Sequence, residues 1–189
     1  MTTSTLDLLL AGNQLKRTAR TGWVMRGVPN SEDVAAHSYG VAWTAMLLAN
    51  QITLESGQSF DMGRLLSMVL IHDVAEGRTT DIPTPALRFL PAGVKPDIER
   101  GAMHEITDGH AQSDQLMSLW EEMNGGETAE SKLLHDADKL EMYLQAWQYE
   151  QQFGNRQLGE FWKKEHRFQF NLCQTVYGEI RAMRETGPT

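Results

Sequence analysis

The stretch "LIHDVAEGRTTDIPTP", residues 70–85, places acidic and imidazole side chains directly after a run of apolar residues. His72, Asp73 and Glu76 carry groups that are costly to bury unless something pairs with them. A metal ion is one such partner, and a polar cap at an ordinary helix end is the other explanation. On a helix, Glu76 lies on the same face as Asp73 and His72, because residues three and four apart are neighbours. The adjacent pair of His72 and Asp73 reaches one ion only if the ion sits between their two directions.

Apolar residues at helical spacing surround this stretch and predict helices nearly throughout. We expect one helix to begin at the capping residue Asp61, to run to about Glu76 and to stop at Gly77. The segment "TTDIPTP" should then form a loop, because its prolines cannot continue a helix. Further helices are expected around Leu6–Leu15 and Val34–Leu48, at residues 97–107 and 113–123, in a long central helix within 125–153, and in an amphipathic tail at 156–184 broken near Gly159 or Gly178.

We find no strand pair, internal repeat or linker in this pattern. The prediction is an all-α fold, a single domain over residues 1–189 built as an irregular helical bundle.

Composition limits the classes of function. The net charge of −8 over 189 residues argues against binding a long nucleic acid, whose affinity comes largely from Lys and Arg. A few local arginines can still bind a small anion. The apolar runs are too short to span a membrane, and the first residues lack the layout of a secretory signal, so we expect a cytoplasmic protein. Cys173 is the lone cysteine, which excludes an internal disulfide and a cysteine-based zinc site.

Two other segments place ligand-type side chains in predicted helices. "VAAHSYGVAW" contains His37, and "LLHDADKLEM" contains Asp136 and Asp138 in the long central helix. A carboxylate that faces the core needs a partner. Taken alone, His37 is more simply a hydrogen-bonded core imidazole, and the two aspartates fit a solvated face equally well. Helical spacing does not choose between the two aspartates. Together with residues 72 and 73, the order along the chain is H, then HD, then D.

This order resembles the H…HD…D signature of the HD-domain metal-dependent phosphohydrolases. The segments "RTGWVMRGV", "HSYGVA", "HDVAEGRTTDIPTP" and "ESKLLHDADKLEMYLQAWQYE" resemble more closely the HD-domain 5′-deoxynucleotidases, over residues 14–168. The resemblance implies that His37, His72, Asp73 and Asp138 bind one divalent cation, for which Mn, Co, Fe, Ni, Zn and Mg are all candidates. It also suggests Asp136 as an acceptor that orients a ligand imidazole.

The resemblance implies catalytic roles for two residues of the opening stretch. Glu76 matches the family's catalytic acid/base, and we group it with the ligand Asp73 as the catalytic pair. Asp81 matches the position that accepts a hydrogen bond from the sugar 3′-hydroxyl. Without the resemblance, Glu76 would be a helix-terminal salt-bridge partner and Asp81 would be a cap.

The resemblance also implies residues that contact the substrate. Trp23 matches a tryptophan that packs near the sugar C2′, where a rigid indole leaves no space for a ribose 2′-hydroxyl. By itself Trp23 would be read as a core aromatic. Some bacterial members carry a phosphate-binding arginine immediately before this tryptophan, where the present chain has Gly22. Either Arg20 or Arg26 is therefore expected to bind the phosphate.

The leading expectation is a phosphomonoesterase that releases the 5′-phosphate of (deoxy)ribonucleoside 5′-monophosphates, with a preference for deoxyribonucleotides. Relatives suggest a homodimer, for which an amphipathic C-terminal helix could supply the interface. The alternatives are an HD hydrolase of another small phosphate ester, an HD oxygenase with a second metal, and a non-catalytic HD-fold module. His104 and His110 lie where two-metal relatives carry extra ligands, but we expect them to be surface imidazoles, together with His135 and His166.

Overall fold

The computed structural model describes residues 3–163 and 166–186. Within these ranges the chain is helical, and the strand-like pairing there is the single bridge between Ala19 and Asp33. The prediction of an all-α fold is confirmed. The α-helices are α1 (Thr5–Gln14), α2 (Thr21–Val24), α3 (Val34–Ser56), α4 (Met62–Ile71), α5 (Glu76–Thr79), α6 (Thr84–Leu87), α7 (Val94–Thr107), α8 (Ser113–Gly125), α9 (Ala129–Phe153) and α10 (Asn171–Thr186), and the 3₁₀ helices are η1 (Leu15–Arg17) and η2 (Arg156–Trp162).

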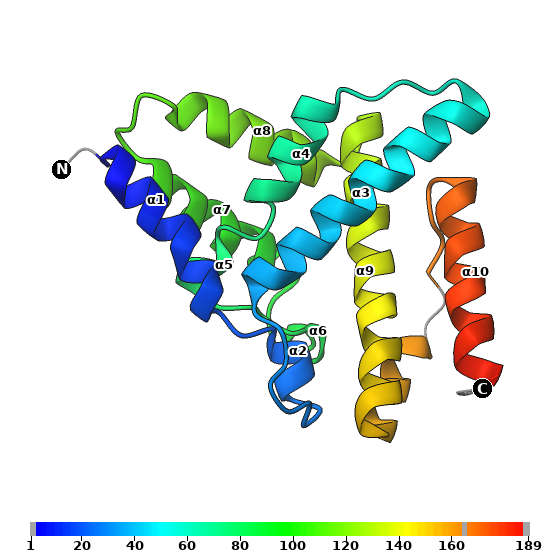
Figure 1. The fold of residues 1–189 in the computed structure, drawn as a ribbon. Coiled ribbons are helices and arrows are strands. Elements are labelled where there is room, and N and C mark those ends of the chain that lie inside the picture. The colour runs from blue at the N-terminus through cyan, green and yellow to red at the C-terminus, as the bar shows by residue number, and fades with distance from the viewer. Residues whose placement is uncertain (1–2, 164–165, 187–189) are drawn as a thin grey trace.

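The long helices α3 and α9 cross at the centre of the bundle (Figure 1). Each begins at a side-chain cap: Asp33 accepts the N–H of Ala36 at 2.8 Å, and Thr128 accepts the N–H of Ser131 at 3.3 Å. Alanines on both helices are fully buried, and such small side chains let two helix backbones approach closely.

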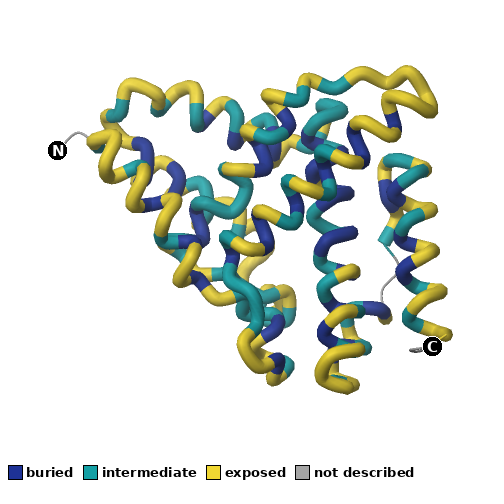
Figure 2. The backbone as a smooth tube through the Cα atoms, in the orientation of Figure 1, coloured by how far each residue is buried: buried dark blue, intermediate teal, exposed yellow. Residues whose placement is uncertain are grey.

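The other helices cover the two sides of this central pair. Helices α4 and α8 pack near the start of α9, α1 and α7 lie together at one side, and α10 runs along α9 (Figure 1). The buried residues form one continuous apolar cluster that extends from Ala11 to Ile180. Figure 2 shows the buried positions on the inward faces of these helices. None of the helices described is long and apolar enough to cross a membrane.

The end of α4 differs from the prediction. The helix stops at Ile71, and residues 72–75 form a turn before α5 begins at Glu76. The N–H of Val74 bonds to the carbonyl of Ile71, and the N–H of Glu76 bonds to the carbonyl of Asp73. These three-residue spacings replace the four-residue spacing of an α-helix and tighten the chain. Gly77 therefore lies inside α5 instead of ending the preceding helix.

The predicted loop after α5 also contains a short helix. Helix α6 begins at Thr84 with Pro85 in its first turn, where the missing proline N–H costs nothing.

The predicted break in the tail is wrong as well. Gly159 lies inside η2, which ends at Trp162, and Gly178 lies inside α10, which begins at Asn171. Asp136 of α9 accepts the backbone N–H groups of Gln169 and Phe170 at 2.9 and 3.0 Å, just before α10 begins. A carboxylate from another helix thus caps α10, an interaction that local sequence spacing does not reveal.

Candidate metal centre and substrate pocket

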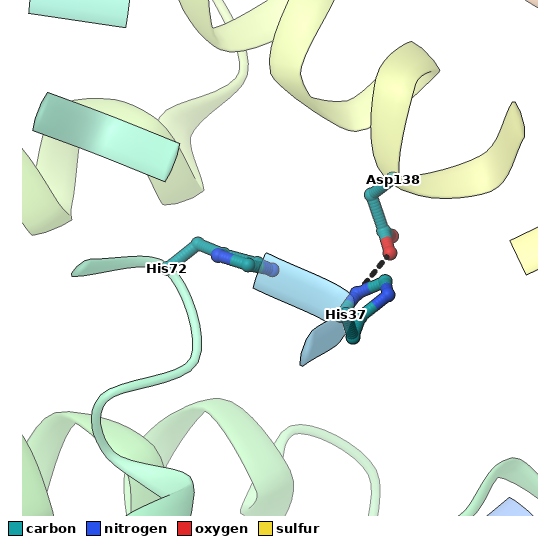
Figure 3. A group of neighbouring side chains, drawn as sticks. All are labelled: His37, His72 and Asp138. Carbon is teal, nitrogen blue, oxygen red and sulfur yellow. Dashed lines mark ion pairs between the residues drawn. The ribbon is translucent and has the colours of Figure 1, made fainter. Parts of the chain in front are cut away.

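Two imidazoles and two carboxylates from separate elements meet at one point of the bundle. His37 comes from α3, Asp138 comes from α9, and His72 and Asp73 come from the turn after α4. His37 Nε2 lies 3.1 Å from Asp138 Oδ1 and 3.8 Å from Asp73 Oδ2. His72 Nε2 lies 3.2 Å from Asp73 Oδ2. Figure 3 shows His37, His72 and Asp138, whose ligand atoms all lie within 4.8 Å of one another. The structure brings together all four residues that the sequence singled out as metal ligands.

The atoms that face this point lack hydrogen-bond partners. His37 Nε2, His72 Nε2 and Asp73 Oδ2 are buried and make no hydrogen bond, although each lies close to another polar atom of the cluster. An unsatisfied buried polar group costs about 1–3 kcal/mol, so these atoms need a further polar or cationic partner. Imidazole nitrogens and carboxylate oxygens are ligands that Mn, Co, Fe, Ni and Zn accept. The residues therefore fit a divalent cation.

The second nitrogen of each imidazole is held by the protein. His37 Nδ1 lies 2.6 Å from Glu141 Oε2, and His72 Nδ1 lies 2.6 Å from the carbonyl oxygen of Val69. Such contacts fix the ring and leave Nε2 free to face the cluster. The suggestion that Asp136 orients an imidazole is wrong, because its carboxylate caps α10. Glu141 has this role for His37, and its position one helical turn after Asp138 is the signal that could have identified it.

The charges of the cluster suit a cation. Burial alone would raise the pKa of Asp138, but the charge of Lys139 and the contact with His37 hold the pKa of that carboxyl well below its usual range. Burial lowers the pKa of His37, but its close contacts with the carboxylates of Asp138 and Glu141 outweigh burial and raise the pKa to about 10. A cation bound by His37 would require the unprotonated Nε2 atom, so binding would compete with protonation of this imidazole.

Glu76 lies at the edge of this cluster, at the start of α5, and is 3% exposed. Its Oε2 atom is buried without a hydrogen-bond partner. Burial, followed by the charges of Asp73 and Asp81, raises the pKa of Glu76 to about 9. A carboxyl group with this pKa carries a proton at neutral pH, so it can serve as a general acid.

A pocket opens beside the cluster, and it is lined by every residue that the sequence singled out for substrate binding. Its walls contain Arg20, Trp23, Arg26 and Asp81, together with Asp73, Glu76 and Asp138. Three further lining residues, Lys95, Lys139 and Phe161, were not part of that set. The pocket thus combines cationic side chains, a cluster of acidic side chains and an aromatic wall, as a site for an anionic ligand with a ring requires.

The two candidate arginines differ in their surroundings. The guanidinium of Arg20 is largely buried and lies 3.6 Å from Asp73 Oδ2, so it points toward the cluster. The guanidinium of Arg26 donates to the carbonyl of Gly22 at 2.8 Å and to Glu160 at 3.1 Å, and it stacks on Phe161. The two terminal nitrogens of Arg26, Nη1 and Nη2, are already engaged, so Arg26 is less available to a phosphate than Arg20, whose guanidinium faces the cluster.

Asp81 and Trp23 are connected through α2. Asp81 Oδ2 accepts the backbone N–H of Thr21 at 2.7 Å and so caps the first turn of α2. The interpretation of Asp81 as a cap is therefore correct. Trp23, in the same short helix, is 2% exposed and packs against Phe161. The core interpretation of Trp23 is also correct, although part of its surface lines the pocket.

Lys95 is one of the lining residues that sequence spacing gave no reason to select. It lies in the first turn of α7 and pairs with Glu99 at 3.3 Å. An i, i+4 pair of Lys and Glu usually marks an exposed helix face. In the structure, burial lowers the pKa of the Lys95 ammonium group. The negative charge of Glu99, together with the charges of Glu76 and Asp73 near the ammonium group, outweighs burial and raises this pKa.

The remaining histidines lie apart from the cluster. His110 contacts Thr5 Oγ1 and accepts the N–H of Gln112, while His104 is exposed on α7. His135 contacts the carbonyl of Met123.

Comparisons with known proteins agree with this geometry. The HD domain family model matches residues 12–176, and the chain therefore belongs to the HD domain family.

Within that family the chain is similar to proteins named 5′-deoxynucleotidase HDDC2. The Dictyostelium discoideum protein is 35% identical over 150 residues, which cover 78% of each chain. The Homo sapiens protein is 36% identical over 149 residues, which cover 78% of this chain and 69% of that protein. A conserved hypothetical protein from Pyrococcus furiosus has a similar structure, with a TM-score of 0.82 and 33% identity over 95% of this chain and 100% of that chain. The resemblance seen in the sequence is confirmed.

Proposed function

We propose that this chain is a metal-dependent phosphohydrolase that removes the 5′-phosphate from deoxyribonucleoside 5′-monophosphates, and that residues 1–189 act as one domain. The observation that carries the proposal is the convergence of unpartnered, buried ligand atoms beside the buried carboxyl group of Glu76, at the wall of a pocket that also contains Arg20 and Lys95. The names of the relatives supply the substrate class. The net charge of −8 favours a small nucleotide over a long nucleic acid.

His37, His72, Asp73 and Asp138 would hold one divalent cation, with Mn, Co, Fe, Ni, Zn and Mg as candidates. When bound, such a cation polarises a phosphate oxygen and lowers the pKa of nearby water. Glu141 and the carbonyl of Val69 keep the imidazoles oriented, as the 2.6 Å contacts with their Nδ1 atoms indicate.

The protein side chains bind the phosphate and complete the proton transfer. Arg20 offers a planar pair of donors to the phosphate, and Lys95 adds a point charge on the side of Glu76. Water adds its oxygen to phosphorus, and the bond from phosphorus to O5′ breaks with its electron pair on O5′. Glu76 gives its proton to that oxygen, which leaves as the nucleoside hydroxyl. One proton of the attacking water restores the Glu76 carboxyl group, and the other stays on the released phosphate.

Trp23 and Asp81 would select the sugar. The indole of Trp23 is packed too firmly to yield to a 2′-hydroxyl, which favours deoxyribose by exclusion. Asp81 binds Thr21 through Oδ2, so Oδ1 remains to accept a hydrogen bond from a 3′-hydroxyl.

The test uses purified protein that is stripped of metal and reloaded with each cation in turn. Phosphate release is measured with matched deoxyribo- and ribonucleoside 5′-monophosphates and with other small phosphate esters. We expect Glu76→Gln to bind the cation normally and to lose turnover by at least about 100-fold. The exposed control Glu179→Gln should match the wild type.

Equal losses of cation binding and turnover in Glu76→Gln would make Glu76 a ligand or a structural residue. Turnover confined to non-nucleotide esters would favour a hydrolase of another phosphate ester. No turnover with any cation and substrate would favour a non-catalytic HD-fold module.

The exposed apolar face of α3 supports a homodimer. Tyr39, Trp43 and Leu47 follow one another at four-residue spacing, and they are 73%, 53% and 47% exposed. The apolar face of α10 is already packed on α9, so the C-terminal helix is a weaker candidate for the interface. Light scattering of the wild type and Trp43→Glu tests this, because a charge in the interface should yield monomers.

We also propose a cytoplasmic location, which agrees with a chain that has one buried free thiol.

A further inference from the structure

The indole of Trp23 is fixed by contacts on several sides. Its nitrogen Nε1 donates a hydrogen bond to Glu32 Oε1 at 2.8 Å. The ring packs against Phe161 with centroids 4.7 Å apart and meets the edge of Tyr149 at 79°. The aromatic contacts limit how far the ring can slide, but only the hydrogen bond fixes which edge of the indole faces Glu32.

Glu32 is itself held in place. It lies between α2 and α3, immediately before the capping residue Asp33, and its backbone N–H donates to the hydroxyl of Tyr149 at 2.8 Å. Its carboxylate oxygen lies within 4.8 Å of ligand atoms of His37 and Glu141. Glu32 therefore stands between the indole that lines the pocket and the pair of side chains behind the candidate metal centre.

We propose that Glu32 is a positioning residue that sets sugar selectivity by holding the indole of Trp23 against the pocket. This inference rests on the proposed function, in which Trp23 excludes the ribose 2′-hydroxyl. Discrimination against one hydroxyl group requires a wall that does not move by even about 1 Å. Without Glu32, the indole N–H would be buried and unsatisfied, which favours rotation or displacement of the ring.

The expected signature is a change in selectivity with little change in the reaction itself. An indole that can withdraw makes space for ribose, so kcat/KM for ribonucleotides should rise toward the value for deoxyribonucleotides. Glu32→Ala should lower the ratio of deoxyribo to ribo kcat/KM by about tenfold, the equivalent of one lost hydrogen bond. Glu32→Gln retains a carbonyl oxygen that can accept from the indole, and it should retain most of the wild-type ratio.

The experiment measures this ratio with one cation for the wild type, Glu32→Ala, Glu32→Gln and the exposed control Glu179→Ala. If Glu32→Ala does not fold, Glu32→Asp takes its place, because the shorter side chain withdraws the carboxylate from the indole. Cation affinity is measured in parallel by competition with a chelator. The indole ¹⁵N–¹H signal of Trp23, assigned through its loss in Trp23→Phe, should shift in Glu32→Ala and stay close to its wild-type position in Glu32→Gln.

Three outcomes would overturn the proposal. An unchanged ratio in Glu32→Ala, with the indole signal shifted, would show that indole position does not set selectivity. A parallel loss of cation affinity and of turnover on both sugars would place the effect of Glu32 at His37. A wild type without sugar preference would remove the deoxyribose part of the proposed function, and the wild-type measurement alone distinguishes this failure from the other two.

Discussion

Gly40 offers a direct test of how the metal centre is built. It lies on α3 one turn after His37, and it faces Glu141 of α9. A Cβ atom at this position would lie 2.7 Å from Oε1, 2.9 Å from Cγ and 3.1 Å from Cδ of Glu141. These distances are too short for ordinary contact and include atoms behind the carboxylate oxygens. In Gly40→Ala, the Glu141 side chain must therefore shift, and we expect this shift to break its contact with His37.

The size of the effect follows from two opposing terms. Gly→Ala in a helix interior gains about 1 kcal/mol from helix propensity. Displacement of Glu141 breaks its 2.6 Å contact with His37 Nδ1. A hydrogen bond to a charged group contributes about 1.5–3 kcal/mol, so Gly40→Ala should lower the free energy of unfolding by about 0.5–2 kcal/mol. Loss of the residue that orients a ligand imidazole should weaken cation binding by about 10–100-fold.

Gly178→Ala is the matched control. Gly178 lies in the interior of α10, and a Cβ added there meets no atom of the described chain within 4 Å. This variant should gain up to about 1 kcal/mol and bind cations like the wild type. Denaturant unfolding and chelator competition measure both quantities. If Gly40→Ala gains stability as Gly178→Ala does and binds the cation with wild-type affinity, Glu141 does not orient His37.

Two further predictions concern Lys95 and Cys173. Lys95→Gln should lower kcat/KM for nucleotides by about tenfold without a change in stability, because it removes a charge from the pocket beside Glu76. Lys95→Arg should restore part of this loss, and a similar loss in the exposed control Lys16→Gln would contradict a role in the pocket. Cys173 should resist thiol reagents in the folded protein and react fully in denaturant, because burial and then the charge of Asp136 raise the pKa of its thiol. Stoichiometric labelling of the native protein would show that this part of the core opens readily.

Local patterns were sufficient to predict most helices. The capping residue Asp61 begins α4 as predicted, and its carboxylate accepts the N–H of Arg64 at 2.9 Å. Errors occurred where a distant residue determines the backbone path. The start of α10 depends on Asp136 of α9, and the end of α4 depends on a turn that places His72 and Asp73 in the cluster.

The candidate site was predictable to a similar degree. The four candidate metal ligands each lie in a short motif, so the family resemblance could identify them. Helical periodicity alone did not distinguish Asp136 from Asp138. The structure separates these two aspartates: one caps α10, and the other faces His37. Lys95 and Glu32 could not be predicted from local sequence patterns. Lys95 lies on a helix face whose sequence indicates exposure, and Glu32 lies in a loop without a repeating pattern, so only the tertiary fold places them near the site.

The crossing of α3 and α9 connects the cation site to the sugar wall. His37 and Gly40 are three residues apart on α3, and Asp138 and Glu141 are three residues apart on α9, so each pair shares a helix face. One crossing therefore places both a candidate ligand and the carboxylate that orients it. Glu32 extends the same network toward the indole that lines the pocket. Substitutions at this crossing should therefore alter cation affinity, whereas Glu32→Ala should alter sugar discrimination and Lys95→Gln should alter phosphate binding.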